Sequence, residues 1–215
     1  MAQVFPQWAN KVPLVAGVAA VAFALFATFG IWYWFSPRFT DVGYRPEQPV
    51  PFSHKLHAGD LQVSCLYCHG NVERAAVASV PSTQLCMNCH TLVARDKPSL
   101  DPLRASASSG QPMMWVRVHK IPDYAFFTHA PHLSAGVGCS SCHGDVKAME
   151  RVQQVEPLSM AWCLDCHRDP GKSLRAPEEL LDTAWVAPAD QGARSAKWLT
   201  ERRLAPPVDC SGCHR

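Results

Sequence analysis

Several features that mark common protein classes are missing from this chain of 215 residues. It contains no glycine-rich phosphate-binding loop and no basic patch of the kind that binds nucleic acid, so no nucleic-acid partner is predicted. No segment predicts a β-sheet, while 18 prolines and 12 glycines break the chain into short pieces. No cysteine is left over for a disulfide framework, because all ten belong to one repeated motif.

That motif is Cys-x-x-Cys-His, which occurs five times. It is the attachment signature of a c-type haem: two thiols form thioethers to the vinyl groups, and the histidine is the proximal iron ligand. A structural zinc site, a disulfide or a redox-active pair would explain the cysteines, but zinc requires no histidine directly after each second cysteine. We therefore predict five covalently bound haem c groups. Their attachment residues are Cys65, Cys68, Cys86, Cys89, Cys139, Cys142, Cys163, Cys166, Cys210 and Cys213, and their proximal ligands are His69, His90, His143, His167 and His214.

The other five histidines equal in number the distal ligands that five haems need. Four of them lie in a repeated phrase, Phe52-Ser-His54-Lys-Leu-His57 and Phe127-Thr-His129-Ala-Pro-His132, and each phrase precedes two haem motifs. The chain thus reads as two dihaem modules, at about 52–95 and 127–170, followed by a C-terminal haem segment at 171–215. Ordinary surface or packing roles are the alternative for these side chains. The predicted distal ligands are His54, His57, His129 and His132, and the candidates for the fifth are His119, Met149 and Met160.

An uncharged apolar run extends from Val12 to Phe35 and ends in five large apolar residues, Ile31-Trp-Tyr-Trp-Phe35. As a helix it would be about 36 Å long, enough for a hydrocarbon core of roughly 30 Å. Aromatic residues at its end are typical of a membrane interface, whereas a cleaved secretion signal is the alternative. Lys11 before the helix, and the formation of thioethers on the exported side, predict a periplasmic haem domain. We expect a cytoplasmic N-terminus at 1–11, a transmembrane helix at 12–35, a linker at 36–51 and a periplasmic pentahaem domain at 52–215.

The part beyond the apolar run is too short to enclose five porphyrins in a conventional core. We therefore expect the haems to form the core, with the polypeptide wrapped around them as loops and short helices. Helices are predicted at about 83–93, 158–168, 178–183 and 193–203, with a linker or surface excursion at 97–111.

Full ligation would leave no iron site open for a substrate, which favours an electron relay over a catalytic cytochrome. The chain would then be no enzyme on its own. Two alternatives stay open: a stand-alone membrane quinol dehydrogenase that feeds a periplasmic reductase, and a small multihaem reductase with one open haem.

Four stretches carry a resemblance to a known family: Pro49-Val-Pro-Phe-Ser-His54-Lys-Leu-His57-Ala-Gly, Thr83-Gln-Leu-Cys86-Met-Asn-Cys89-His90, Trp115-Val-Arg-Val-His119-Lys-Ile-Pro-Asp-Tyr and Pro157-Leu-Ser-Met160-Ala-Trp-Cys163. With the single N-terminal helix, the chain resembles the pentahaem cytochrome c subunit of alternative complex III, with two cytochrome c7-like dihaem modules. The resemblance is specific in the modules and loose in the last 40 residues.

The resemblance implies a single-pass protein of the cytoplasmic membrane within a quinol-oxidising complex. Its implied partners are an iron–sulfur subunit, polytopic quinol-binding subunits and a monohaem cytochrome c, with a soluble periplasmic electron carrier as acceptor. It also implies that one of the haems has histidine–methionine ligation. In that case one of the five remaining histidines does not bind iron, and His119 is the first candidate for that histidine.

Overall fold

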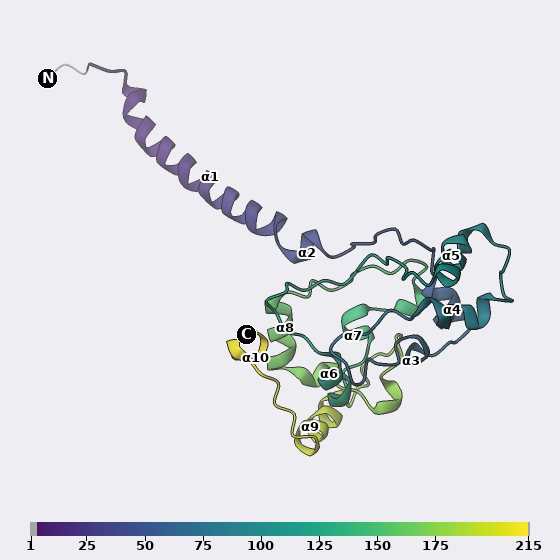
Figure 1. Cartoon of the computed structure of the whole chain (residues 1–215). Coiled ribbons are helices and arrows are strands. Elements are labelled where there is room, and N and C mark those ends of the chain that lie inside the picture. The colour runs from purple at the N-terminus through teal and green to yellow at the C-terminus, as the bar shows by residue number, and fades with distance from the viewer. Residues whose placement is uncertain (1–3, 215) are drawn as a thin grey trace. The chain divides into compact units, whose positions relative to one another are not determined.

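A computed structural model describes residues 4–214; the outermost parts of the expected N-terminal and C-terminal segments, residues 1–3 and Arg215, lie outside the described residues. The chain divides into two compact units between Asp41 and Val42. In the first unit, the short 3-10 helix η1 (Gln7–Lys11) leads into α1 (Val12–Trp34), and α2 (Pro37–Thr40) follows (Figure 1). The helix predicted from the apolar run is confirmed, and α2 adds one turn to the expected linker.

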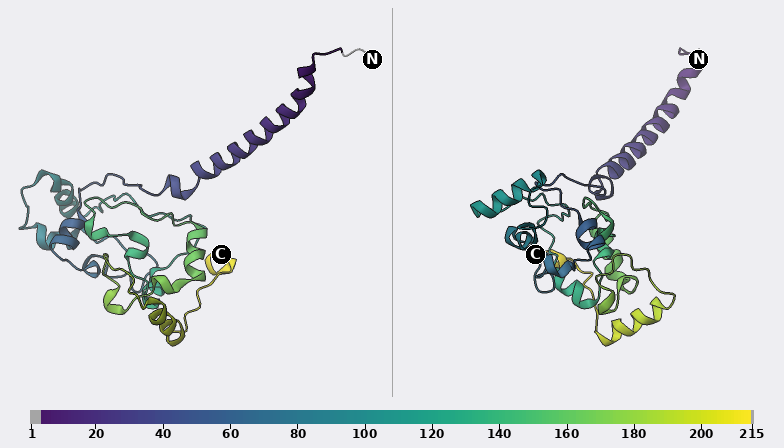
Figure 2. Two further views of the ribbon diagram at one scale, coloured as in Figure 1. Left: turned by 180° about the vertical axis from the view of Figure 1, so that it is seen from behind. Right: turned by 90° about the vertical axis from the view of Figure 1, so that its right-hand side faces the viewer.

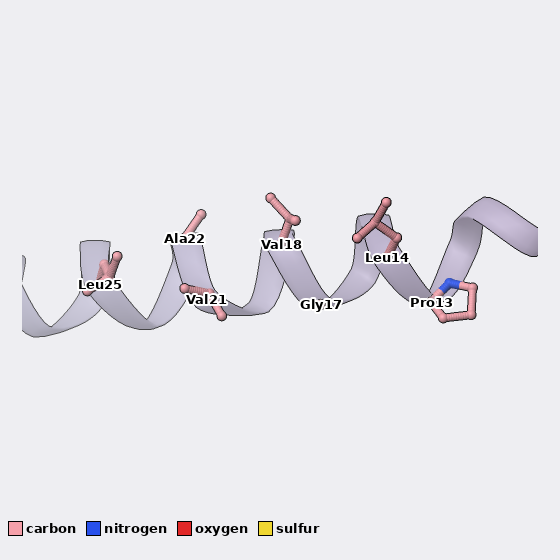
Figure 3. Close-up of a pocket in the computed structure, with 7 residues that line it drawn as sticks. All are labelled: Pro13, Leu14, Gly17, Val18, Val21, Ala22 and Leu25. Atoms are coloured by element: carbon pink, nitrogen blue, oxygen red, sulfur yellow. The ribbon is translucent and has the colours of Figure 1, made fainter.

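The helix α1 is apolar and exposed along its whole length. Pro13 lies in its first turn, where the missing N–H has no helical partner to lose. The helical segment Gln7–Trp34 is long enough to cross a membrane, and an 18-residue window within it has a mean hydropathy of 2.4 with no buried residue. Figure 3 shows one side of α1, where Leu14, Gly17, Val18 and their neighbours line a shallow apolar hollow on the helix itself.

The second unit consists of short helices joined by loops (Figures 1 and 2). Within residues 4–214 the only β-type pairing is one isolated bridge between Val137 and Leu174. The expected fold of loops and short helices without a sheet is therefore confirmed for the described chain. The elements are η2 (a π-turn, Lys55–Asp60), α3 (Cys65–Cys68), α4 (Thr83–His90), η3 (Pro98–Leu100), α5 (Asp101–Ser109), α6 (His129–Ala135), α7 (Ser140–His143), η4 (Val146–Ala148), α8 (Met160–Arg168), η5 (Pro170–Ser173), η6 (Pro177–Glu179), α9 (Gln191–Glu201) and α10 (Cys210–Cys213).

Three of the predicted helices form close to their expected positions, namely α4, α8 and α9. The hydroxyl of Ser159 accepts a hydrogen bond from the Trp162 N–H at the start of α8, and Pro170 follows its end. The segment predicted at 178–183 forms only the short turn η6.

The prediction of a linker at 97–111 is wrong, because most of it forms η3 and α5. Its helix signals are Asp101 and Pro102 in the first turn and Gly110, which ends α5 with a left-handed φ of 70°. Leu103 on α5 is buried, and the Thr83 and Ser106 hydroxyls lie 2.8 Å apart, so α5 packs on α4 rather than extending into solvent.

Little apolar surface is buried within the polypeptide itself. Among the described residues only Val50, Leu103, Leu174 and Ala176 are buried apolar side chains. Most of the buried side chains, polar ones included, lie in the C-terminal third, where Gln191 of α9 donates to the carbonyls of Gly171 and Leu174 at 2.7 and 2.8 Å.

Candidate haem-binding sites

Each pair of cysteines lies on a separate short helix or helical turn: in chain order α3, α4, α7, α8 and α10 carry motifs 1 to 5. A spacing of three residues places both thiols on the same side of such a turn. In motifs 1, 3 and 5 the histidine N–H donates to the carbonyl of the first cysteine at 2.8–3.0 Å. This bond folds the histidine back toward the two thiols, as a shared haem requires.

All ten thiols are free, and none is paired in a disulfide. Among residues 4–214 no three histidine, cysteine or acidic side chains converge as metal ligands. Motif cysteines therefore stand in pairs, unlike the four-ligand cluster of a structural zinc site. Paired thiols with an adjacent histidine fit the attachment chemistry of haem c.

Most histidines present the same nitrogen to the protein. Nδ1 of His69, His90, His167 and His214 lies 2.7–3.0 Å from the carbonyl oxygens of Ser79, Val93, Pro207 and Tyr124. A carbonyl can only accept, so Nδ1 carries the proton and Nε2 keeps its lone pair for a metal. Three further Nδ1 atoms, those of His57, His129 and His132, also bond to carbonyls, of Ser53, Ala76 and Thr128.

Three proximal histidines face a predicted distal histidine at a common separation. The ring centres of His57 and His90 lie 6.1 Å apart, as do those of His132 and His167. His129 and His143 are 6.3 Å apart. Two imidazoles on opposite sides of one metal ion have ring centres about 6 Å apart, because each metal–nitrogen bond is about 2 Å long. These three pairs fit bis-histidine ligation.

The fourth predicted distal ligand, His54, lies close to His69. Its Nδ1 is buried without a hydrogen-bond partner, and burial, followed by the nearby His69 and His57, lowers its pKa to about 4. A neutral imidazole is the form that binds metal. His54 and His69 thus repeat the order of His129 and His143: the first histidine of each repeated phrase lies near the proximal histidine of the first motif after it.

A phenylalanine fixes both histidines of each phrase. The Phe52 ring stacks on His57 at 4.4 Å and meets His54 edge-on at 4.8 Å. Phe127 likewise contacts both histidines of its phrase at 4.7 Å, edge-on to His129 and tilted by 36° against His132. The repeat Phe-x-His-x-x-His therefore corresponds to a repeated structural unit, with the ring holding two imidazoles in place.

The five motifs lie next to one another in space in an order that differs from their order along the chain. Asn88 of motif 2 donates to the Tyr67 hydroxyl of motif 1 at 3.3 Å. The loop after motif 1 meets the second module where the Ala76 carbonyl accepts from His129. The His167 ring of motif 4 bonds to the Pro207 carbonyl just before motif 5.

The electrostatic interactions between cysteine thiols identify the same neighbouring motifs. Each of four thiols has a pKa raised first by burial and then by a thiol of the adjacent motif, and for Cys142 the pKa reaches about 12. The row of motifs is therefore 2–1–3–4–5, and Figure 1 shows α4, α3, α7, α8 and α10 following one another across the second unit. The thiol pairs are Cys68 with Cys86, Cys139 with Cys65, Cys142 with Cys166, and Cys163 with Cys213.

The three candidates for the fifth distal ligand lie in different places. His119 contacts His143, with its Nε2 3.2 Å from Nδ1 of that ring. Met149 lies beside the first module, since its carbonyl accepts from the Lys55 N–H at 2.9 Å. Met160 begins α8, is 65% exposed, and lies one turn before Cys163, whose thiol neighbours motif 5.

A buried cation beside motif 3, Arg175, has a structural role that the sequence did not reveal. Arg175 is 3% exposed, lies over the Trp185 ring at 4.3 Å, and donates to the hydroxyls of Ser140 and Ser141 at 2.9 and 3.2 Å. Its backbone N–H also donates to Gly136. Arg175 thereby holds the helix of motif 3 against the C-terminal segment, a contact between residues 34 and 35 positions apart that no local pattern reveals.

Comparison with known proteins gives two matches. Residues 125–215 match the family of cytochrome c7 and related cytochrome c. The multiheme cytochrome c subunit of menaquinone reductase from Nitratidesulfovibrio vulgaris (strain Hildenborough) is 34% identical over 151 residues, which is 69% of this chain and 63% of the relative. The match thus spans less than two thirds of the relative's length. Both similarities indicate a multihaem cytochrome c with covalently bound haem.

Proposed function

We propose that the chain binds five c-type haems and serves as the membrane-anchored electron-relay subunit of an alternative complex III-type assembly. That assembly oxidises quinol, and the electrons leave to a periplasmic carrier. Haem supplies the one-electron ferric/ferrous couple, and the chain supplies the ligands and the spacing. The observation that carries the proposal is the single row of five attachment motifs, four of which have a second imidazole near the proximal histidine.

The ligand set supports a relay rather than a substrate-binding centre. In motifs 2, 3 and 4 a second imidazole stands about 6 Å from the proximal one, and His54 lies beside His69. Two protein ligands leave an iron no position for substrate. The small apolar core supports the same proposal, since only four apolar side chains are buried in residues 4–214 and porphyrin faces would supply the missing contact.

The fifth centre is assigned to His214 with Met160 as its distal ligand. Within the described chain no histidine ring faces His214 across a metal-sized gap, and its stacked neighbour Tyr124 lies on the Nδ1 side. Met160 lies on α8 one turn before Cys163, whose thiol neighbours Cys213 of motif 5, whereas Met149 lies near the first module. A thioether ligand raises the reduction potential, which suits the end of the row that delivers electrons.

The membrane and the partners follow from α1 and from the relative. The exposed apolar helix anchors the chain, with the haem domain in the periplasm. The relative is a subunit of a quinone-linked enzyme, which supports a shared assembly with quinol-binding membrane subunits. The remaining proposed partners are an iron–sulfur subunit and a monohaem cytochrome c.

The deciding experiment adds a reduced quinol to the isolated holoprotein and to the gently solubilised native assembly, and follows the haem α-band. We expect rapid reduction only in the assembly. Rapid reduction of the isolated chain would place the quinol site on this polypeptide and favour a stand-alone quinol dehydrogenase. If the reduced assembly instead passed electrons to added quinone faster than to a periplasmic carrier, the chain would serve quinone reduction, as the relative's name implies for that protein.

A further inference from the structure

The histidine outside the repeated phrases, His119, has a contact unlike that of any other histidine. In four of the five motifs a backbone carbonyl accepts from Nδ1 of the proximal histidine. In motif 3 the partner of His143 Nδ1 is instead the His119 ring, at 3.2 Å from Nε2. The two rings are nearly perpendicular, with centres 4.3 Å apart and an angle of 80°.

His119 lies on the side of His143 that faces away from the metal position. The distal partner His129 stands 6.3 Å from His143, and the His129 Nδ1 is held by Ala76. Nε2 of both rings is thereby left for the iron between them, and the Nδ1 of His143 points the other way. His119 therefore cannot ligate the same iron, and its own Nε2 is occupied by the hydrogen bond.

We infer that His119 is a positioning residue for the third haem: it accepts the Nδ1 proton of His143 in a hydrogen bond, orients that ring, and lowers the reduction potential of this centre. The inference rests on the proposed haem binding. Motif 3 is the middle of the row 2–1–3–4–5, so His119 would set the potential of the centre that joins the two modules.

The direction of the effect follows from the basicity of the acceptor. A neutral imidazole is a stronger base than a peptide carbonyl, so it polarises the Nδ1–H bond of His143 more strongly. The proximal ring then gives more electron density to the metal and favours the ferric state.

The test uses the full-length holoprotein with His119→Leu, titrated from oxidised to reduced while visible and EPR spectra are recorded. Loss of the hydrogen-bond partner of a metal-ligating histidine typically changes metal affinity or activity by about 10- to 100-fold. We expect the reduction potential of one of the five haems to rise by about 59 mV. For a one-electron couple this corresponds to a tenfold change in the ferric/ferrous ratio. All haems should stay low-spin, and carbon monoxide binding should not increase. Asp123→Asn, an exposed change in the same loop, is the control.

Two results with His119→Leu would overturn the inference. One is a set of potentials that matches the Asp123→Asn control. The other is a new high-spin, carbon monoxide-binding haem, which would make His119 an iron ligand. His119→Gln is the second variant, and its weaker amide acceptor should produce a smaller rise, with no rise counting against the inference. Quinol reduction of the wild-type assembly judges the proposed function separately, so an unchanged potential refutes the role of His119 alone.

Discussion

Substitution of Gly136 should disturb the second module. It ends α6, the helix that carries His129 and His132, with a φ of +103°. A methyl group there would collide with the Arg202 guanidinium and would come within 2.9 Å of the Arg175 carbonyl oxygen. The side chain of Arg202 donates to the Ala135 carbonyl at 2.8 Å, so the collision would break a hydrogen bond at the end of the same helix.

The cost of Gly136→Ala has two parts. Left-handed backbone strain for an L-residue is about 1–2 kcal/mol. Loss of a charge-assisted hydrogen bond adds about 1.5–3 kcal/mol. The sum is roughly 3–5 kcal/mol, and at about 2–4 °C per kcal/mol the melting temperature should fall by roughly 6–20 °C. Thermal unfolding of the holoprotein, followed by far-ultraviolet circular dichroism, measures this.

Gly110 provides a matched control at the end of α5. Its φ is +70°, but a methyl group there would meet nothing within 4 Å. Gly110→Ala should therefore cost only the strain, about 1–2 kcal/mol, or roughly 2–8 °C. Equal losses in the two variants would refute the argument that contacts with the C-terminal segment hold α6 in place.

Four further substitutions test the ligands and the C-terminal packing. His132→Ala should open one iron and give carbon monoxide binding of one equivalent per chain, against almost none in the wild type; no binding would contradict the pairing with motif 4. Met160→Leu should lower the highest of the five potentials, while Met149→Leu should leave all five unchanged, as a redox titration would reveal; the reverse result would exchange their roles. Glu179→Gln should destabilise the protein at neutral pH. The pKa of Glu179 is lowered by bonds from the Ala176 N–H and the Arg194 side chain, so its contribution is present above pH 4.5 and lost as the pH falls through that lowered pKa. Melting curves of the variant should therefore depend less on acid than those of the wild type.

The sequence predicts the chemistry of the sites because attachment depends on local spacing. The motifs, the Phe-x-His-x-x-His phrases and the helices α4 and α8 depend on neighbours within a few residues, such as Ser159 and Pro170 at the two ends of α8. The helix α5 carried comparable local signals, Pro102 and Gly110, but its small polar residues suggested a linker. The burial of Leu103 and the contact of α5 with α4 belong to the tertiary structure, which the local pattern does not show.

The order of the sites was not predictable from local patterns. Nothing near His129 in the sequence indicates that its ring bonds to Ala76, 53 residues earlier. The order 2–1–3–4–5 and the role of His119 arise from such tertiary contacts. Distances along the chain would have suggested 1–2–3–4–5, and the count of spare histidines would have suggested that His119 is a ligand.

These long-range contacts also explain how a chain with so small an apolar core holds its ligands. His167 bonds to a carbonyl 40 residues away and His214 to one 90 residues away. The histidine that would bind iron through Nε2 thus joins two distant loops through Nδ1. A carbonyl bond fixes the tautomer and the ring direction as well as the path of the backbone. Ligand geometry and tertiary structure are therefore maintained by the same hydrogen bonds, so a substitution that moves one of these loops should change a reduction potential and the stability together.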